Sequence, residues 1–333
     1  MARQAQGEFV LFGPGLAQDI MAYKLALYAA VKPEVVVLGS SRAGNVRAAF
    51  FERPFVNMAG AATDLESLRL LVDRMLAVHR PKVVLLGLDF WWLTAGAPAG
   101  RPERIVQPSL LDASTLRAPW RWLVQGRIAP ADMLAPLQHR LRADRYGLEA
   151  QLRDTGYGPD GSLYEGAVLD GRRPAPDHAF ARTLRELESG SGVWAGSLAP
   201  DRERLEAFAE ICCRLRSRGI RTIVFLPPLA TPVLGALADR NGGDAGWLSA
   251  LRQGLLDCGV ESMDFSDPRV YGSGDCEMMD GLHGGDVIGA SLVRDMGDRQ
   301  PWLRDMLHRE YLSHVLRERR GLAAVPDERL TAL

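Results

Sequence analysis

The chain has 333 residues, of which 47% are hydrophobic and 24% charged, and its formal net charge is −1. This length and composition are ordinary for a globular protein with a sizeable core. A nearly neutral chain lacks the basic surface of a general nucleic-acid binder, so no nucleic-acid partner is expected. The sequence carries no signal of an oligomeric state.

The cysteines and the apolar segments do not determine the cellular compartment of the protein. The four cysteines, Cys212, Cys213, Cys258 and Cys276, lack the CxxC spacing of a zinc site, and no metal site is expected. Cys212 and Cys213 are expected to be buried thiols, and a Cys258–Cys276 disulfide stays open. No apolar run approaches the roughly 20 residues of a membrane span, and the first 30 residues do not resemble a signal peptide. The chain as written is expected to be soluble, with a missing anchor left open.

Five apolar segments bounded by turn residues are expected to be strands. They are 34–39, 55–60, 82–90, 220–228 and 259–266. Their nearly unbroken apolar character suits strands covered on both faces, as in a parallel sheet.

Helical patterns lie between these strands, at 63–80, 201–219 and 286–297. Thr63 or Asp64 is expected to cap the first helix, and Asp201 and Gly219 to bound the second. The alternation predicts an α/β fold, a three-layer α/β/α sandwich around a parallel sheet of about five strands. In such sheets ligands bind beyond the carboxyl ends of the strands.

Two regions depart from the alternation. Residues 94–200 are rich in Pro, Gly, Arg and Trp, with helix-like pieces at 109–125 and 130–153. This stretch is too long for a simple loop, so we interpret it as an inserted lid or substrate-recognition region within a single domain spanning 1–333. Residues 301–321 have the pattern of an amphipathic helix. This helix either packs on the body of the protein or serves a partner helix or membrane surface.

Four polar segments follow the predicted strands or lie near the end of the chain. They read "LGSSR" (38–42), "NMAGAAT" (57–63), "LGLDFWW" (86–92) and "MDGLHGG" (279–285). The spacing of Asp280 and His283 lets the carboxylate hold one ring nitrogen while the other takes a proton. A serine hydroxyl is inert until a base within hydrogen-bond reach activates it. The first strand is expected to place Ser40 and Ser41 at the edge of the sheet where the other polar segments lie. Alternatively, Ser41 is a helix cap, and Asp280 caps the helix near 286.

The order of these blocks resembles the SGNH/GDSL hydrolase superfamily. The resemblance covers residues 34–90 and 220–298 and implies a flavodoxin-like fold. It also implies that Ser41 is the nucleophile, with Ser40 where the family usually has Asp. Asp280 and His283 then match the acid and the base of the family. No metal or organic cofactor is implied.

The blocks that hold the oxyanion in this family are less regular here. Backbone N–H groups of Ser41 and of Gly60, or of Ala62 under another alignment, match its donors. The third block usually supplies an Asn side chain, but Asp89 stands there, and an ionised carboxylate does not donate. Asp89 is therefore protonated, points elsewhere, or is replaced by another donor. Asn57 either orders the active-site turn or is an ordinary loop amide.

Two further residues are substrate-binding candidates with a structural alternative. Trp91 stacks on a sugar ring or packs under the inserted region. Arg42 binds an anionic group of the substrate or pairs with a surface acid. A phosphate cradle at this turn is disfavoured, because "GSSRAGN" matches neither glycine pattern of such loops.

The combination of "GSSR" and "GLDFWW" is similar to a looser subset of this superfamily that accompanies bacterial cell-envelope polysaccharide modification. The resemblance implies an esterase or O-acyltransferase acting on acyl esters, such as acetyl esters, of a carbohydrate. It also favours a periplasmic or envelope location and a membrane-associated partner, with a cytoplasmic location left open. The alternative is a non-catalytic relative that binds glycan or scaffolds an envelope complex.

Overall fold

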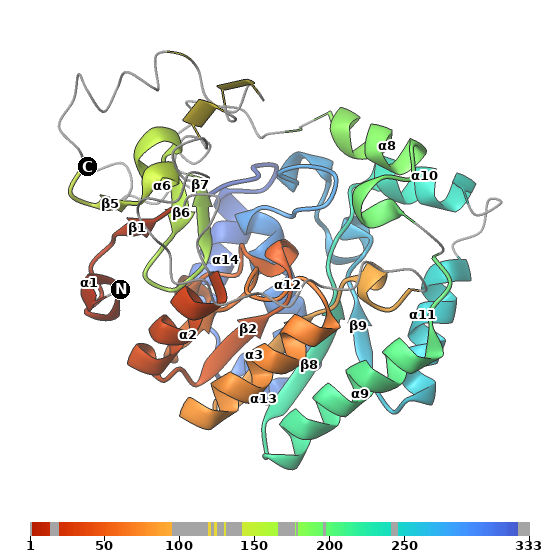
Figure 1. Cartoon of the computed structure of the whole chain (residues 1–333), viewed down its shortest axis with the longest axis horizontal. Coiled ribbons are helices and arrows are strands. Elements are labelled where there is room, and N and C mark those ends of the chain that lie inside the picture. Colours follow the sequence, from red (N-terminus) through yellow and green to blue (C-terminus); the bar gives the residue numbers. More distant parts are fainter. Residues whose placement is uncertain are drawn as a thin grey trace.

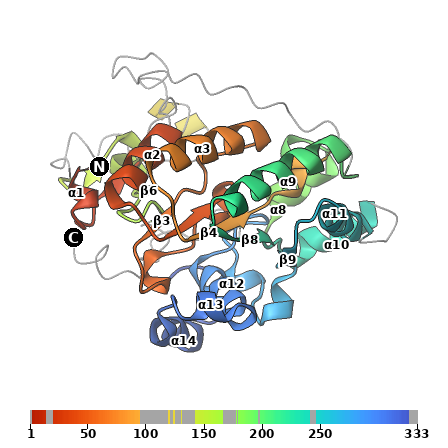
Figure 2. The same cartoon turned by 90° about the horizontal axis from the view of Figure 1, so that it is seen from below.

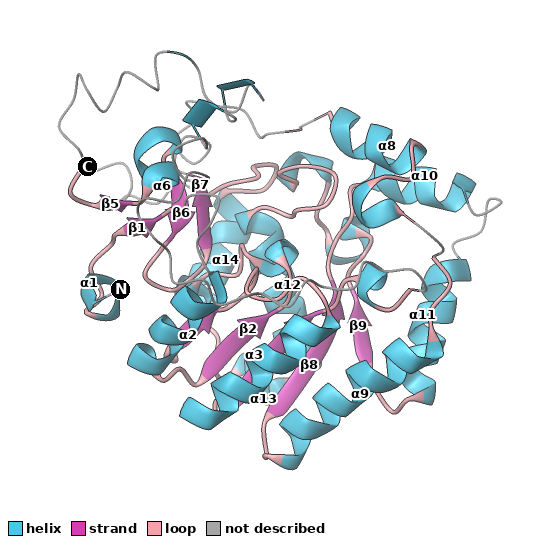
Figure 3. Ribbon diagram, in the orientation of Figure 1, coloured by secondary structure: helices cyan, strands magenta, loops and turns pink. Residues whose placement is uncertain are grey.

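A parallel five-stranded sheet forms the centre of the protein. The computed structural model describes residues 2–13, 20–94, 119–120, 123–124, 130, 142–165, 177, 179–195, 198–240 and 246–325. The strands of the central sheet lie in the order β3-β2-β4-β8-β9, and every neighbouring pair is parallel. Their bounds are β2 (Val35–Leu38), β3 (Phe55–Asn57), β4 (Val83–Gly87), β8 (Arg221–Leu226) and β9 (Ser262–Asp264). All five predicted strands are therefore confirmed (Figure 3).

The strand residues explain why this sheet is buried. Val36 on β2 pairs with Val56 on one side and Val84 on the other, and all three are fully buried. β-Branched side chains pack well on a pleated surface that is covered from both sides. The parallel register brings the carboxyl ends of β2, β3, β4 and β8 to one edge of the sheet.

Helices lie on both faces of the sheet, an arrangement compatible with a three-layer sandwich (Figure 2). On one face are α2 (Ile20–Val31), α3 (Leu65–Val78) and α9 (Arg202–Ser217). On the other are α12 (Asp286–Arg299), α13 (Pro301–Arg304) and α14 (Arg309–Glu318). The helices α10 (Thr231–Arg240) and α11 (Gly246–Asp257) connect β8 to β9.

Local capping explains where two of the predicted helices begin. Asp64, rather than Thr63, caps α3, because its carboxylate accepts the N–H of Ser67 at 2.8 Å. Asp201 caps α9 by accepting the N–H of Arg204 at 3.0 Å. Side-chain caps of this kind satisfy backbone donors that have no partner within the helix.

A second, smaller sheet joins the N-terminal segment to part of the predicted insertion (Figure 1). Its order is β5-β1-β6-β7, with β1 (Leu11–Phe12), β5 (Arg145–Tyr146), β6 (Thr155–Tyr157) and β7 (Leu163–Glu165). The described part of 130–153 contains β5 and the short helix α6 (Leu148–Arg153), so the helix-like pattern there is confirmed only over α6. Most of the predicted helix 109–125, like most of the insertion, lies outside the described residues.

The C-terminal region is not the single helix that its pattern suggested. The chain turns between α13 and α14, and the His308 ring accepts the N–H of Tyr311 at the start of α14. The apolar side chains Leu303, Leu312 and Val315 are buried against the body of the protein. Packing on the body, one of the two alternatives, is therefore the arrangement in this structure.

All four cysteines are free, so the Cys258–Cys276 disulfide is absent. Cys212 is buried as expected, but Cys213 is exposed because it lies on the solvent side of α9. Within the described residues, no helix is both long and apolar enough to cross a membrane.

Candidate active site

The nucleophile candidate lies directly after β2. Gly39 adopts φ +137°, and a Cβ on it would lie 2.7 Å from the carbonyl oxygen of Gly87, so only glycine fits this turn. The hydroxyl of Ser40 then accepts the N–H of Arg42 and caps the short 3₁₀ turn Ser41–Ala43. The cap is therefore Ser40, and the side chain of Ser41 is left for other contacts.

Ser41, His283 and Asp280 form one continuous chain of hydrogen bonds. The hydroxyl of Ser41 lies 2.9 Å from Nε2 of His283. Nδ1 of the same ring lies 2.9 Å from both carboxylate oxygens of Asp280. With a proton on Nδ1 facing the carboxylate, Nε2 is free to accept the proton of the serine hydroxyl.

Asp280 also folds the loop that carries His283. Its Oδ1 accepts the backbone N–H groups of Leu282 and His283, both at 2.8 Å. It does not cap α12, because Gly285 occupies that position. Burial alone would raise the pKa of Asp280. His283 opposes this effect through its hydrogen bond and its positive charge, and the two backbone N–H groups oppose it as well. Together they outweigh burial and lower the pKa of Asp280 to about 2. Asp280 is therefore ionised at neutral pH.

Asp89 is turned toward Arg42 and away from an oxyanion-binding role. Nη1 of Arg42 donates to Oδ1 of Asp89 at 2.8 Å, and both side chains are almost fully buried. Burial raises the pKa of Asp89, and Arg42 is the strongest group opposing that rise. Arg42 therefore pairs with an acid, as one of the two alternatives predicted. That acid is buried, so the prediction that it lies on the surface is wrong. The guanidinium faces the protein interior instead of the substrate side.

The backbone N–H groups expected to bind an oxyanion, those of Ser41 and of Gly60 or Ala62, differ in whether they already have a partner. The N–H of Gly60 donates to the carbonyl of Gly39 at 2.9 Å, so it is already engaged. In the described part of the chain, the N–H groups of Ser41 and Ala62 have no hydrogen-bond partner. Of the two alternative positions, Gly60 and Ala62, only Ala62 therefore has an N–H that is not already engaged. The hydroxyl of Tyr157, from the small sheet, lies beside Gly60.

Asn57 holds the turn that carries Ser41 from the inside of the protein. It is completely buried, and its amide donates to the carbonyls of Ala43 and Val46 at 2.9 and 3.0 Å. Its side-chain oxygen accepts the N–H of Ala59. The backbone oxygen of Asn57 accepts from the buried Lys24, whose pKa burial lowers to about 7. No polar atom of the Asn57 side chain is left to bind substrate.

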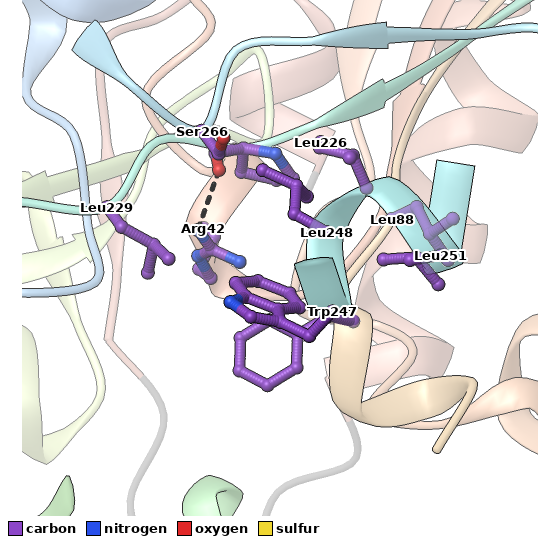
Figure 4. Close-up of a pocket in the computed structure, with 10 residues that line it drawn as sticks. Arg42, Leu88, Leu226, Leu229, Trp247, Leu248, Leu251 and Ser266 are labelled. Carbon is purple, nitrogen blue, oxygen red and sulfur yellow. Dashed lines mark hydrogen bonds between the residues drawn. The ribbon is translucent and has the colours of Figure 1, made fainter. Parts of the chain in front are cut away.

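Trp91 is half-buried and packs against its neighbours. The Arg42 guanidinium lies 5.4 Å from its ring centroid, and the Phe90 ring meets it edge-on at 4.9 Å. Beyond Arg42 is a small pocket lined by apolar residues that include Leu229, Trp247 and Leu248 (Figure 4). It leaves about 10 Å³, the space of roughly one water molecule.

One contact of the site has no signal in the sequence. Arg182, on α8 (Ala181–Glu188) of the predicted insertion, places Nη2 3.6 Å from Oδ2 of Asp280. The adjacent Thr183 packs against Gly281. Part of the predicted insertion therefore lies over the loop that carries Asp280 and His283.

No protein-family model matches the chain, and no curated protein does either. Chemically, the arrangement joins a hydroxyl, an imidazole and an ionised carboxylate at the carboxyl edge of a parallel sheet. Such a set can generate a serine nucleophile without a metal. Across the described residues, no cluster of His, Cys, Asp and Glu has the geometry of a metal site.

Proposed function

We propose that this protein is a serine-dependent ester hydrolase or O-acyltransferase of SGNH type. The observation that supports the proposal best is the chain of contacts from Ser41 through His283 to Asp280, each at 2.9 Å. These residues come from opposite ends of the sequence and meet where the strands end, as ligand sites of parallel sheets do.

The reaction begins when Nε2 of His283 takes the proton of Ser41, whose Oγ attacks the acyl carbonyl carbon. The tetrahedral intermediate collapses as the protonated His283 gives this proton to the leaving alcohol. Asp280 orients the ring and stabilises its positive charge, because it is ionised. Water or a sugar hydroxyl then attacks the acyl-enzyme, with His283 again acting as the base.

Two backbone donors bind the oxyanion in this proposal, the N–H groups of Ser41 and Ala62. Asp89 supplies no third donor, because its side chain is fully buried and paired with Arg42. Each donor that is aimed at a developing oxyanion contributes several kcal/mol to transition-state stabilisation, about 3 to 4 for a single side chain in measured cases. Without a third donor, the reaction is expected to be slower than at a site that has three.

The substrate class rests on the resemblance of "GSSR" and "GLDFWW" to proteins of cell-envelope polysaccharide modification. We propose an acyl ester of a carbohydrate, such as an acetyl ester, with no metal or organic cofactor. A membrane-associated partner would supply or receive the acyl group in the transferase form of the reaction.

Labelling with a fluorophosphonate, which reacts only with activated serines, tests the proposal. We expect one adduct per chain on the peptide that contains Ser41, and hydrolysis of an aryl acetate. Ser41→Ala should lose both signals, while Ser40→Ala should retain the adduct. Absence of any Ser41-dependent adduct and of aryl acetate hydrolysis would refute the catalytic proposal.

The engaged N–H of Gly60 and the pairing of Asp89 favour one alternative, a non-catalytic glycan-binding or scaffold protein. Such a protein keeps the geometry of the triad but lacks a complete oxyanion site. It would bind acylated oligosaccharides in calorimetry with equal affinity in the wild type and in Ser41→Ala, and it would give no adduct.

A further inference from the structure

The guanidinium of Arg42 is a buried charge beside the site, and it makes four hydrogen bonds. It donates through Nη1 to Asp89 at 2.8 Å and through Nε to the carbonyl of Leu282 at 3.0 Å. Its Nη2 donates to the carbonyls of Pro227 and Pro228. The side chain is 3% exposed and that of Asp89 is fully buried, so solvent does not compete for these bonds.

These contacts join the two loops that carry the reacting groups. Arg42 directly follows Ser41 in the sequence, and Leu282 directly precedes His283. The Nε bond to Leu282 therefore fixes the His283 loop to the turn of the nucleophile. The remaining bonds join the same guanidinium to Asp89, shortly after β4, and to Pro227 and Pro228, directly after β8. Both strands belong to the central sheet.

The chemistry of arginine suits this position better than that of lysine. A guanidinium holds its N–H donors in a fixed plane, so it serves acceptors from several directions at once. A lysine ammonium is a compact point charge on a flexible stem and has three donors. It would retain the ion pair with Asp89 but would not span the carbonyls of Leu282, Pro227 and Pro228 in the same geometry.

Asp89 makes the buried arginine tolerable. A buried charge is costly unless it is paired and hydrogen-bonded. Asp89 supplies the opposite charge at the position where the resembling family has a neutral donor. The buried ion pair thus explains both residues, the carboxylate at position 89 and the arginine directly after Ser41.

We propose that Arg42 and Asp89 are a positioning pair, which holds the Ser41 turn against the His283 loop and occupies the place of a side-chain oxyanion donor. The proposal extends the proposed function, since Ser41 and His283 are taken as the reacting groups. It assigns neither residue to substrate binding, because the guanidinium is buried and each of its three nitrogens donates to a protein acceptor.

Arg42→Lys tests this role, with Arg145→Lys as the matched control. Arg145 is also a completely buried arginine, paired with Asp154, but it lies in the small sheet. Amide hydrogen exchange of Leu282 and His283, followed by NMR, reports on the His283 loop without requiring catalysis. We expect at least tenfold faster exchange at both amides in Arg42→Lys and no change there in Arg145→Lys. Fluorophosphonate labelling should slow tenfold to a hundredfold in Arg42→Lys alone.

A second comparison separates positioning from stability. Arg42→Met and Asp89→Leu each leave one buried charge unpaired, so each should lower the melting temperature. The double variant Arg42→Met/Asp89→Leu removes both charges and should recover much of that loss, because a buried ion pair is often replaceable by apolar groups. It should still show fast exchange at Leu282 and His283 and slow labelling.

Wild-type exchange and labelling rates in a folded Arg42→Lys or double variant would overturn the proposal. So would failure of Arg42→Lys to fold while Arg145→Lys folds, since Arg42 would then act through overall stability. If the wild type itself gives no Ser41 adduct, the proposed function fails, and the exchange comparison still decides whether the pair positions the loop.

Discussion

The hydroxyl of Ser41 lies 2.9 Å from Nε2 of His283, although the two residues are 242 positions apart in the sequence. Two local devices produce this contact. Gly39 turns the chain after β2, and Asp280 folds the loop of His283 through its two backbone hydrogen bonds. Each of the two side chains is thus oriented by its own loop, as a pre-organised site requires.

Asp280→Asn is expected to reduce aryl acetate hydrolysis by about 10³- to 10⁴-fold, because a neutral amide neither fixes the tautomer of His283 nor stabilises its charge. Steady-state rates at neutral pH measure the effect. Asp305→Asn is the matched control, since Asp305 stands at the same spacing before His308. Equal losses in the two variants would contradict the assignment of Asp280.

Acid should remove the stabilisation that Asp280 contributes. Its pKa is about 2 in the folded protein and near 4 in an unfolded chain, so the unfolded state binds more protons between these values. The contribution, about 2 kcal/mol, is present above pH 4 and is lost as the pH falls toward 2. Urea titrations at pH 5 and pH 3 should show a smaller decrease in the free energy of unfolding for Asp280→Asn than for the wild type. An equal decrease would show that Asp280 carries no such linkage.

Lys24 should produce a second rise of stability with pH, this one in the alkaline range. Burial lowers its pKa from 10.5 to about 7, with Asp160 opposing the change, so the unfolded chain binds the additional proton between pH 7 and 10.5. The free energy of unfolding should therefore rise by about 2 to 3 kcal/mol between pH 7 and pH 9. Lys24→Met should flatten this rise. A gradient that persists in Lys24→Met would assign it to other groups.

Gly39→Ala should be more damaging than another glycine substitution at positive φ. A Cβ at Gly39 meets the carbonyl of Gly87 at 2.7 Å, whereas a Cβ at Gly219, where φ is +73°, meets nothing within 4 Å. We expect Gly219→Ala to lose about 1 kcal/mol from backbone strain, and Gly39→Ala to lose clearly more. Denaturant titration measures both, and fluorophosphonate labelling should fall only in Gly39→Ala. Equal losses of stability would mean that the turn after β2 adjusts freely.

Much of the central fold was predictable because its signals are local. Apolar runs such as Val35–Leu38 indicated strands buried on both faces, and Asp201 indicated the start of a helix by its own capping chemistry. The small sheet was not predictable, because its strands are two or three residues long and β1 pairs with β5 across more than a hundred positions. Pairings between such short, distant segments leave no periodic pattern.

By itself, the sequence determined the parallel sheet, the edge at which Ser41 lies and the pairing of Asp280 with His283 as a hypothesis. Spacing could not single out that pair, because Asp305 and His308 have the same spacing, yet the His308 ring caps α14. Only the tertiary structure decided that Arg42 and Asp89 are partners and that the N–H of Gly60 is engaged. Side-chain periodicity and caps depend on neighbours within a few residues, whereas buried ion pairs and loop contacts depend on which chain ends the sheet brings together.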